Sequence, residues 1–390
     1  MREKRISVRS HWTLFPAAIA AVFFITSPLI ADNKINRTWS IQTVDSAGNV
    51  GYYTGLAFDS NGRPRIAYYD QGNGDVKHAV LNGTTWVTQV VDSAGNVGEN
   101  LSIGVDRSGY AGIAYYDVTN TNLKFAWQSG ASWNPTTVDS AGEVGMHTSV
   151  VFDSSNKPGI SYFDNANHDL KYAAWNGSSW DRQTVQSTGW VGSWTSLALD
   201  TKDSPRISYY DYPNGDLKFA AWNEASWDIQ TVDSAGDVGR MTSLALDETG
   251  APRIAYWDVT NSSLKYAAWN GSTWVFEVVD SGSDLRYPSL ALATDGMPEI
   301  AYCDYTDGDL KFAVCNGSSW GTEIVDSTGD VGRDPSLAID PLGNPWISYY
   351  DATNGDLKIA YLPEPATLSL LALGGLALLR RRGRIATRPV

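Results

Sequence analysis

Seven tryptophans recur along the chain at an almost constant spacing. They are separated by five steps of 47 residues and a last step of 46, at Trp39, Trp86, Trp133, Trp180, Trp227, Trp274 and Trp320. A fixed period of this length is typical of repeat proteins in which each unit is one supersecondary element. The spacing therefore constrains the fold before any single residue is considered, and it leaves the chemistry open.

Each repeat contains four short segments that alternate apolar and polar residues. In the fourth repeat they are Thr195–Asp200, Arg206–Asp211, Leu217–Trp222 and Trp227–Val232. This alternation, rich in aromatic and β-branched residues and broken by Asn-Gly turns, predicts antiparallel strands. Four strands in seven units predict an all-β, seven-bladed β-propeller over residues 32–362. The repeated tryptophans are expected to pack between blades rather than to bind a ligand.

The register of the repeat also predicts how the ring closes. The first strand after the N-terminal segment is Trp39–Val44, and the last strand is Leu357–Leu362. If the tryptophan strand is the outermost strand of each blade, the N-terminal strand completes the last blade. Such pairing hides a strand edge that would otherwise invite aggregation.

The N-terminus has the pattern of a secretory signal peptide over residues 1–31. Four basic residues (Arg2, Lys4, Arg5 and Arg9) precede an apolar run from Trp12 to Ala31. This layout predicts export with cleavage after Ala31. A retained membrane anchor is the alternative.

The C-terminal residues 363–390 contain three parts in a fixed order. Pro363, Glu364 and Pro365 precede an apolar stretch from Ala366 to Leu379, and Arg380, Arg381 and Arg382 follow it. We expect a short apolar transmembrane helix with a basic tail on the cytoplasmic side. The arrangement resembles the PEP-CTERM sorting signal. The resemblance implies processing by an exosortase-type membrane enzyme and a final place on the surface or in the extracellular matrix of a Gram-negative bacterium that makes exopolysaccharide.

The charge of the chain is unevenly distributed. The full chain carries −14 and the two ends +3 and +4, which leaves −21 for residues 32–362. A body of this charge repels nucleic acid and anionic membranes, so membrane contact is expected only through the C-terminal helix. The two cysteines, Cys303 and Cys315, are expected to remain free because their strand positions lie too far apart for a disulfide.

Two families of loops are expected to emerge on one face of the propeller. One has the pattern VDSAGxVG, as in residues 44–51, and the other YYDxxNGD, as in residues 69–75. Both carry an aspartate in nearly every repeat, for example Asp45 and Asp70. Such residues usually cap nearby backbone amides. A calcium ion held by these oxygens is the alternative, and no other cofactor is expected.

Two adjacent positions after the Val-Gly of the first loop, or its equivalent, differ in every repeat. They supply aromatic side chains in some repeats and arginines in others. Aromatic faces and guanidinium forks suit sugar rings and carboxylated glycans. The predicted ligand-binding residues are Tyr52, Tyr53, Trp190, Trp194, Arg240, Arg286, Tyr287 and Arg333. Of these, Trp190 lies just before the Val-Gly of the fourth repeat, and the others occupy the variable positions.

The sequence carries no convincing catalytic constellation. The third repeat contains a candidate metal site at His147, Asp164, His168 and Asp169. The leading hypothesis is an exported binding or structural module, with exopolysaccharide as the suggested ligand. The alternatives are a polysaccharide hydrolase or lyase acting on the loop face, and a structural matrix protein without a discrete ligand.

Overall fold

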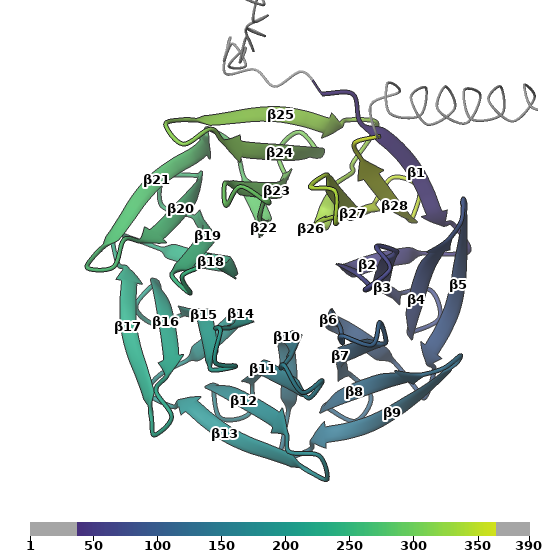
Figure 1. The fold of residues 1–390 in the computed structure, drawn as a ribbon, viewed down its shortest axis with the longest axis horizontal. Coiled ribbons are helices and arrows are strands. Elements are labelled where there is room, and N and C mark those ends of the chain that lie inside the picture. Colours follow the sequence, from purple (N-terminus) through teal and green to yellow (C-terminus); the bar gives the residue numbers. More distant parts are fainter. Residues whose placement is uncertain (1–36, 364–390) are drawn as a thin grey trace, which may run out of the picture. The chain divides into compact units, whose positions relative to one another are not determined.

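A computed structural model of the chain describes residues 37–363, and these residues form seven four-stranded antiparallel sheets. The sheets surround a central axis as the blades of a propeller (Figure 1). This confirms the predicted all-β fold with seven blades of four strands. The expected signal peptide, sorting signal and C-terminal helix lie outside the described residues.

The first three blades have strand orders β2-β3-β4-β5, β6-β7-β8-β9 and β10-β11-β12-β13. Their strands are β2 (Val50–Phe58), β3 (Pro64–Asp70), β4 (Asp75–Asn82), β5 (Thr85–Asp92), β6 (Val97–Val105), β7 (Ala111–Asp117), β8 (Asn122–Ser129), β9 (Ser132–Asp139), β10 (Val144–Phe152), β11 (Pro158–Asp164), β12 (Asp169–Trp175) and β13 (Trp180–Gln186).

The next three blades follow the same order. Their strands are β14 (Val191–Leu199), β15 (Pro205–Asp211), β16 (Asp216–Trp222), β17 (Trp227–Asp233), β18 (Val238–Leu246), β19 (Pro252–Asp258), β20 (Ser263–Trp269), β21 (Trp274–Ser281), β22 (Leu285–Leu292), β23 (Pro298–Asp304), β24 (Asp309–Cys315) and β25 (Trp320–Asp326).

The seventh blade combines strands from both ends of the described chain. It contains β26 (Arg333–Ile339), β27 (Pro345–Asp351), β28 (Asp356–Tyr361) and, as its outer strand, β1 (Ser40–Asp45). β1 pairs antiparallel with β28, with Ser40 opposite Tyr361 and Gln42 opposite Ile359. Within residues 37–363 there is no helix, and hence none long and apolar enough to cross a bilayer.

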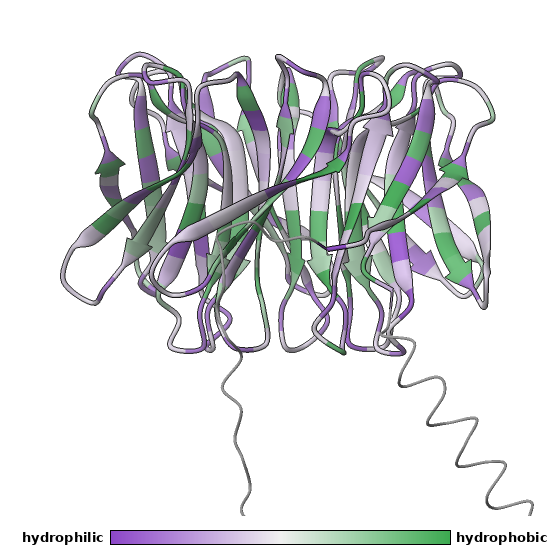
Figure 2. Cartoon of the chain, turned by 90° about the horizontal axis from the view of Figure 1, so that it is seen from above, coloured by the Kyte–Doolittle hydropathy of each residue, from purple (hydrophilic) through white to green (hydrophobic). Residues whose placement is uncertain are grey.

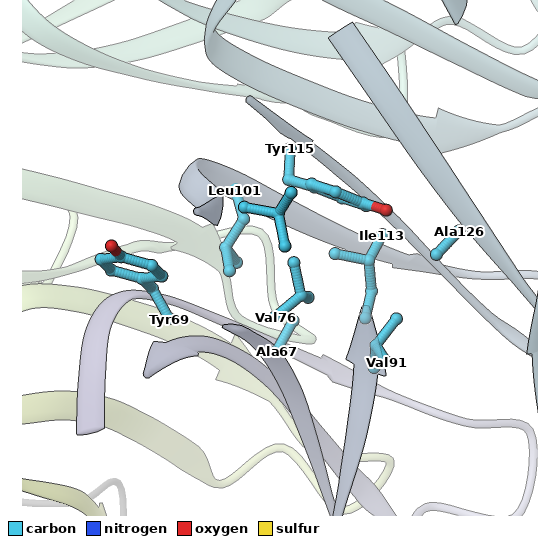
Figure 3. Close-up of a cluster of buried hydrophobic side chains, with 9 residues drawn as sticks. Ala67, Tyr69, Val76, Val91, Leu101, Ile113, Tyr115 and Ala126 are labelled. Carbon is cyan, nitrogen blue, oxygen red and sulfur yellow. The ribbon is translucent and has the colours of Figure 1, made fainter. Parts of the chain in front are cut away.

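The hydrophobic core lies between neighbouring blades. One cluster joins Val91 and Val76 of the first blade to Ile113 and Tyr115 of the second (Figure 3). The third strand from the rim is buried along its whole length in four blades, as in β7 and β11, and at all but one residue in the other three. Figure 2 shows that hydrophobic residues concentrate on the strands rather than on the connecting loops.

The repeated tryptophans bridge adjacent blades, as expected. The Trp180 ring meets the edge of Phe125 at 5.5 Å between centroids, and Trp227 meets Tyr172 at 5.7 Å. The indole Nε1 of Trp227 donates a hydrogen bond to Gln183 of the preceding blade at 3.1 Å. Cys303 and Cys315 are both buried and free, which confirms the prediction for the two thiols.

A buried contact between an aspartate, a tyrosine and a lysine recurs at the blade junctions. Asp92, at the end of β5, accepts a hydrogen bond from Ala94 N at 3.1 Å and another from the Tyr115 hydroxyl at 2.6 Å. Lys124 of the same second blade forms an ion pair with it. The aspartate of the VDSAGxVG loop therefore caps its own loop, as predicted. It also binds the next blade, a role that was not predicted from the sequence.

The junction between the third and fourth blades departs from this contact. Gln186 replaces the aspartate and accepts a hydrogen bond from Tyr209. Lys218 is left with Asp211 and Asp216 of its own blade, at 3.5 and 3.8 Å. This is the junction at which an ion pair between blades is missing among the described residues.

We expect Gln186→Asp to stabilise the protein by about 1 kcal/mol, because the new carboxylate gives Lys218 a partner across the junction. Asp92→Asn should destabilise it by about 1–3 kcal/mol, because Lys124 then loses its charged partner. Burial raises the pKa of Asp92, but hydrogen bonds from Lys124 and Tyr115 outweigh it and hold that pKa below 3.8. The Asp92 contribution is therefore present above pH 3.8 and is lost as the pH falls towards the lower folded-state pKa.

Urea unfolding of the two variants and the unmodified protein at pH 7 and pH 3 measures both effects. An unchanged midpoint for Gln186→Asp at pH 7 would contradict the role assigned to this contact.

Candidate functional site

The two predicted loop families share one face of the propeller, as expected. The Gln71 amide donates to the Asn49 carbonyl at 2.9 Å, and the Val97 amide donates to the Gly74 carbonyl at the same distance. Both bonds join the turn between β3 and β4 to the start of an innermost strand or the loop before it, at β2 for the first bond and at β6 for the second. We call this side the loop face, and equivalent bonds repeat around it.

The two variable positions lie at an irregularity near the start of each innermost strand. In β2 the pairing register shifts between Val50 and Tyr52 and again between Tyr52 and Gly55. The second variable residue has a left-handed backbone in all seven blades, with φ between 48° and 55°. We call these residues the channel ring: Tyr53, Asn100, His147, Trp194, Met241, Tyr287 and Asp334.

A left-handed backbone is uncommon for residues other than glycine and costs about 1 kcal/mol or more for most of them. The glycine that precedes this bulge is needed for a different reason. A Cβ on Gly145 would lie 2.6 Å from the Leu123 Cα of the neighbouring blade. The Val-Gly pair therefore sets the close approach of the blades, and the strained residue that follows carries a side chain to the axis.

The channel ring lines the mouth of a central cavity of about 500 Å³. Below it lies a ring of serines that tie the innermost strands together. Ser149 Oγ accepts from the Leu197 amide at 3.0 Å, and Ser196 Oγ accepts from the Leu244 amide at 3.0 Å. The cavity is thus rigid and polar at depth, with its variable side chains at the mouth.

Two members of the channel ring are linked to their neighbours by hydrogen bonds. His147 Nδ1 accepts from the Trp194 amide at 2.9 Å, and Asp334 Oδ2 accepts from the Tyr53 amide at 3.3 Å. Burial lowers the pKa of His147 to about 4, so its imidazole is neutral at pH 7. Burial raises the pKa of Asp334 to about 6, against the opposing effects of the Tyr53 amide and Arg333.

The predicted arginines lie on the loop face and are already paired. Arg240 forms a bidentate contact with Asp237, with Nε–Oδ1 and Nη2–Oδ2 distances of 3.2 and 2.8 Å. Arg286 pairs in the same way with Asp284. Arg333 likewise pairs with Asp330 and lies 4.8 Å from the Tyr305 ring centroid. The three guanidinium groups therefore do not form an open basic surface.

The predicted aromatic residues separate into three groups. Tyr53, Trp194 and Tyr287 belong to the channel ring. Tyr52 packs against Tyr350 at 4.1 Å between centroids, between the first and last blades. Trp190 lies away from the cavity, in the loop that joins the third blade to the fourth.

Trp190 is the centre of an exposed aromatic surface. Its ring stacks on His168 at 4.5 Å and on Tyr212 at 4.9 Å, with interplanar angles of 8° and 25°. The side chains of Trp190 and Tyr212 are 38% and 48% exposed. We call His168, Trp190 and Tyr212 the aromatic platform.

The same backbone bonds that repeat around the ring hold the platform. The Val191 amide donates to the His168 carbonyl at 3.0 Å, and the Tyr212 amide donates to the Trp190 carbonyl at 2.9 Å. At the next junction the three equivalent positions are Gly215, Asp237 and Val259. Within the described residues, all three of these positions carry rings at only one of the seven junctions.

A paired substitution connects the platform to the channel ring. In the first blade the Tyr69 hydroxyl donates to Asn96 at 2.6 Å. In the third blade Phe163 and Trp190 occupy these positions, and their rings are 6.4 Å apart and almost parallel. Phe163 also stacks with His147 at 6.1 Å. A polar bridge is thus replaced by aromatic contacts that extend from the channel mouth to the exposed surface.

The predicted metal group does not assemble. His147 lies in the channel ring and His168 in the platform, and Phe163 stacks with both. Asp164 Oδ1 instead accepts from the Asn167 amide at 3.0 Å, and its other oxygen lies 3.5 Å from Lys171 Nζ. In the part of the chain that the structure describes, no group of three or more His, Cys, Asp or Glu residues is arranged to hold a metal ion.

The sequence did not predict His168 and Tyr212 as parts of the platform or Asp334 as part of the cavity. Tyr212 was detectable in principle, because an aromatic residue there departs from the Gln71 and Val118 of earlier repeats. Asp334 was one of the variable pair but resembled the many other loop aspartates. Its place in the cavity depends on a backbone conformation that the sequence does not reveal.

No protein-family model matches this sequence, and no curated protein is detectably similar to it. Solved structures share its fold at low sequence identity. YCF48 from Cyanidioschyzon merolae is 12% identical with a TM-score of 0.56, covering 84% of this chain and 100% of that chain. A polysaccharide lyase, the PL25 ulvan lyase, is 13% identical with a TM-score of 0.53, covering 82% and 95%. A fungal alcohol oxidase of the AA5 family is 10% identical with a TM-score of 0.55, covering 83% and 76%. These likenesses establish the propeller fold alone.

Proposed function

We propose that this protein is an exported carbohydrate-binding propeller that holds a glycan against the aromatic platform on its loop face. The observation that carries the proposal is the concentration of three near-parallel rings, His168, Trp190 and Tyr212, at one of seven equivalent junctions. A scaffold role would apply to every junction. A feature restricted to one junction and left exposed is better explained by a ligand.

The chemistry of the platform favours a sugar over other flat ligands. Pyranose rings present an apolar face of C–H groups that packs on exposed aromatic rings, while their hydroxyls remain hydrated. Nucleic-acid bases also stack on such rings, but a body with a net charge of −21 repels their phosphates. The guanidinium of Arg240, which lies 5.9 Å from the Tyr212 ring centroid, is already paired with Asp237, so a neutral glycan suits the surface better than a carboxylated one.

The comparison with solved structures supports the proposal by analogy of fold. A polysaccharide lyase with this fold shows that such a scaffold can act on polysaccharide, although fold does not determine function. Export and sorting to the cell surface rest on residues 1–31 and 363–390 of the sequence. An exopolysaccharide of the producing cell is the ligand that this location would offer.

Trp190→Ala should weaken binding to neutral polysaccharide at least tenfold, since the central ring of the platform is lost. The measurement is affinity electrophoresis in gels that contain neutral or uronate-rich polysaccharides. Tyr305→Ala is the matched control, because it removes an aromatic ring at the position equivalent to Tyr212 two junctions away. Equal effects of the two substitutions would contradict the platform as the site. Shortened polysaccharide chains after incubation would favour the enzyme alternative.

Export predicts that the mature protein begins at Asp32. Mass spectrometry of protein from a Gram-negative host that has an exosortase-type enzyme tests this, and a chain that retains Met1 would refute it. Replacement of Pro363, Glu364 and Pro365 by alanine should leave the protein in the inner-membrane fraction. Arg380, Arg381 and Arg382 remain in place in that variant, so only the proposed recognition motif changes.

We also propose that β1 acts as the clasp of the ring, through its pairing with β28 and the 3.1 Å hydrogen bond from Trp39 Nε1 to Glu323. A chain shortened to begin at Gly48 should unfold at a temperature at least several degrees lower and associate through the exposed β28 edge. Thermal melting with light scattering provides the measurement. An unchanged melting temperature with a monomeric product would exclude this role.

A further inference from the structure

The channel ring has an acidic and aromatic side that the proposed glycan site does not use. Asp334 of the seventh blade lies between Tyr287 of the sixth and Tyr53 of the first, and all three line the cavity. The Tyr53 amide donates to Asp334 Oδ2 at 3.3 Å. The charge of Asp334 raises the pKa of both tyrosines, beyond the larger effect of their burial, which places the carboxylate close to both phenols.

This carboxylate forms no ion pair within the described residues, although the charge of Arg333 acts on it from nearby. No lysine or arginine lines the cavity mouth. The nearest guanidinium in the sequence, that of Arg333, forms a bidentate contact with Asp330 instead. Glu99 adds a second half-buried carboxylate near Tyr53, since its charge also raises the pKa of that phenol. The mouth is therefore negative and partly aromatic.

A buried anion without a partner is unfavourable unless a cation accompanies it. Tyrosine rings next to a carboxylate suit an organic ammonium group in particular, because the ring quadrupoles attract its charge while its alkyl groups fill an apolar space. A metal ion would need more oxygen ligands than Asp334 and its neighbours supply. A hydrated sugar would leave the carboxylate without a counter-charge.

We propose that the channel mouth binds an organic cation with a primary or quaternary ammonium group, held by the Asp334 carboxylate and the rings of Tyr53 and Tyr287. This site is separate from the aromatic platform and does not depend on the glycan proposal. Its ligand can be a small free amine or an ammonium group carried on a larger molecule, such as an amino sugar.

Binding should depend on pH through Asp334, whose pKa burial raises to about 6. The groups that face it are Tyr53, Tyr287 and Cys303 from neighbouring strands and Arg333 beside it in the chain. None of their own pKa values is lowered towards neutrality. Cation affinity is therefore expected to be constant above about pH 7 and to fall below pH 6, as the carboxylate takes up a proton.

Isothermal titration calorimetry of the purified protein with choline tests the proposal, and 3,3-dimethyl-1-butanol serves as its uncharged isostere. We expect choline to bind and the isostere to bind at least tenfold more weakly. Glucosamine compared with glucose distinguishes an amino sugar from a small free amine.

Asp334→Asn should abolish choline binding at pH 7.5, while its side-chain oxygen still accepts from the Tyr53 amide and preserves the fold. An unchanged melting temperature would verify that the fold is intact. Trp190→Ala should leave choline binding unaltered, which separates this site from the platform. Absence of choline binding, equal binding of the isostere, or binding indifferent to Asp334→Asn would overturn the inference.

Discussion

The contact on which the ring depends is the buried carboxylate shared between blades. One oxygen of Asp92 caps the loop that follows it, and the other accepts from a tyrosine and a lysine of the next blade. A buried charge is tolerated only when its hydrogen-bonding capacity is filled, and this arrangement fills it from two blades at once. Six of the seven junctions described here contain such an aspartate, so the contact fixes the angle at which each blade meets the next.

Specialisation appears where this regular contact is weakened. The junction between the third and fourth blades has Gln186 in place of the aspartate, and it also bears the aromatic platform. Stacking among Phe163, Trp190 and Tyr212 supplies contact area at the surface, while Lys218 loses its partner across the junction. The proposed glycan site thus coincides with the junction that lacks this ion pair, and functional sites are commonly obtained at some expense of stability.

The sequence was sufficient for the architecture because each blade repeats its strand and turn pattern. Blade number, strand positions, the common face of the two loop families and the free cysteines all followed from periodicity and turn chemistry. The site was harder to predict because side-chain direction depends on backbone angles. Tyr52 and Tyr53 are adjacent and alike in sequence, yet the left-handed φ of Tyr53 sends only that side chain into the cavity. The pairing of the predicted arginines was not foreseen because their partners, such as Asp237, resembled ordinary turn residues.

The channel ring itself argues for a function at the axis. Glycine would relieve the strain at each of its seven positions at almost no steric cost, and asparagine would tolerate it well. The chain instead has tyrosine, histidine, tryptophan, methionine and aspartate at six of them, and asparagine only at position 100. Hydrogen bonds to His147 and Asp334 offset part of the strain at two junctions. At the remaining positions the side chains line the cavity, and Tyr53 and Trp194 also pack on neighbouring rings, so the proposed ligand at the axis is one reason for retaining the strain.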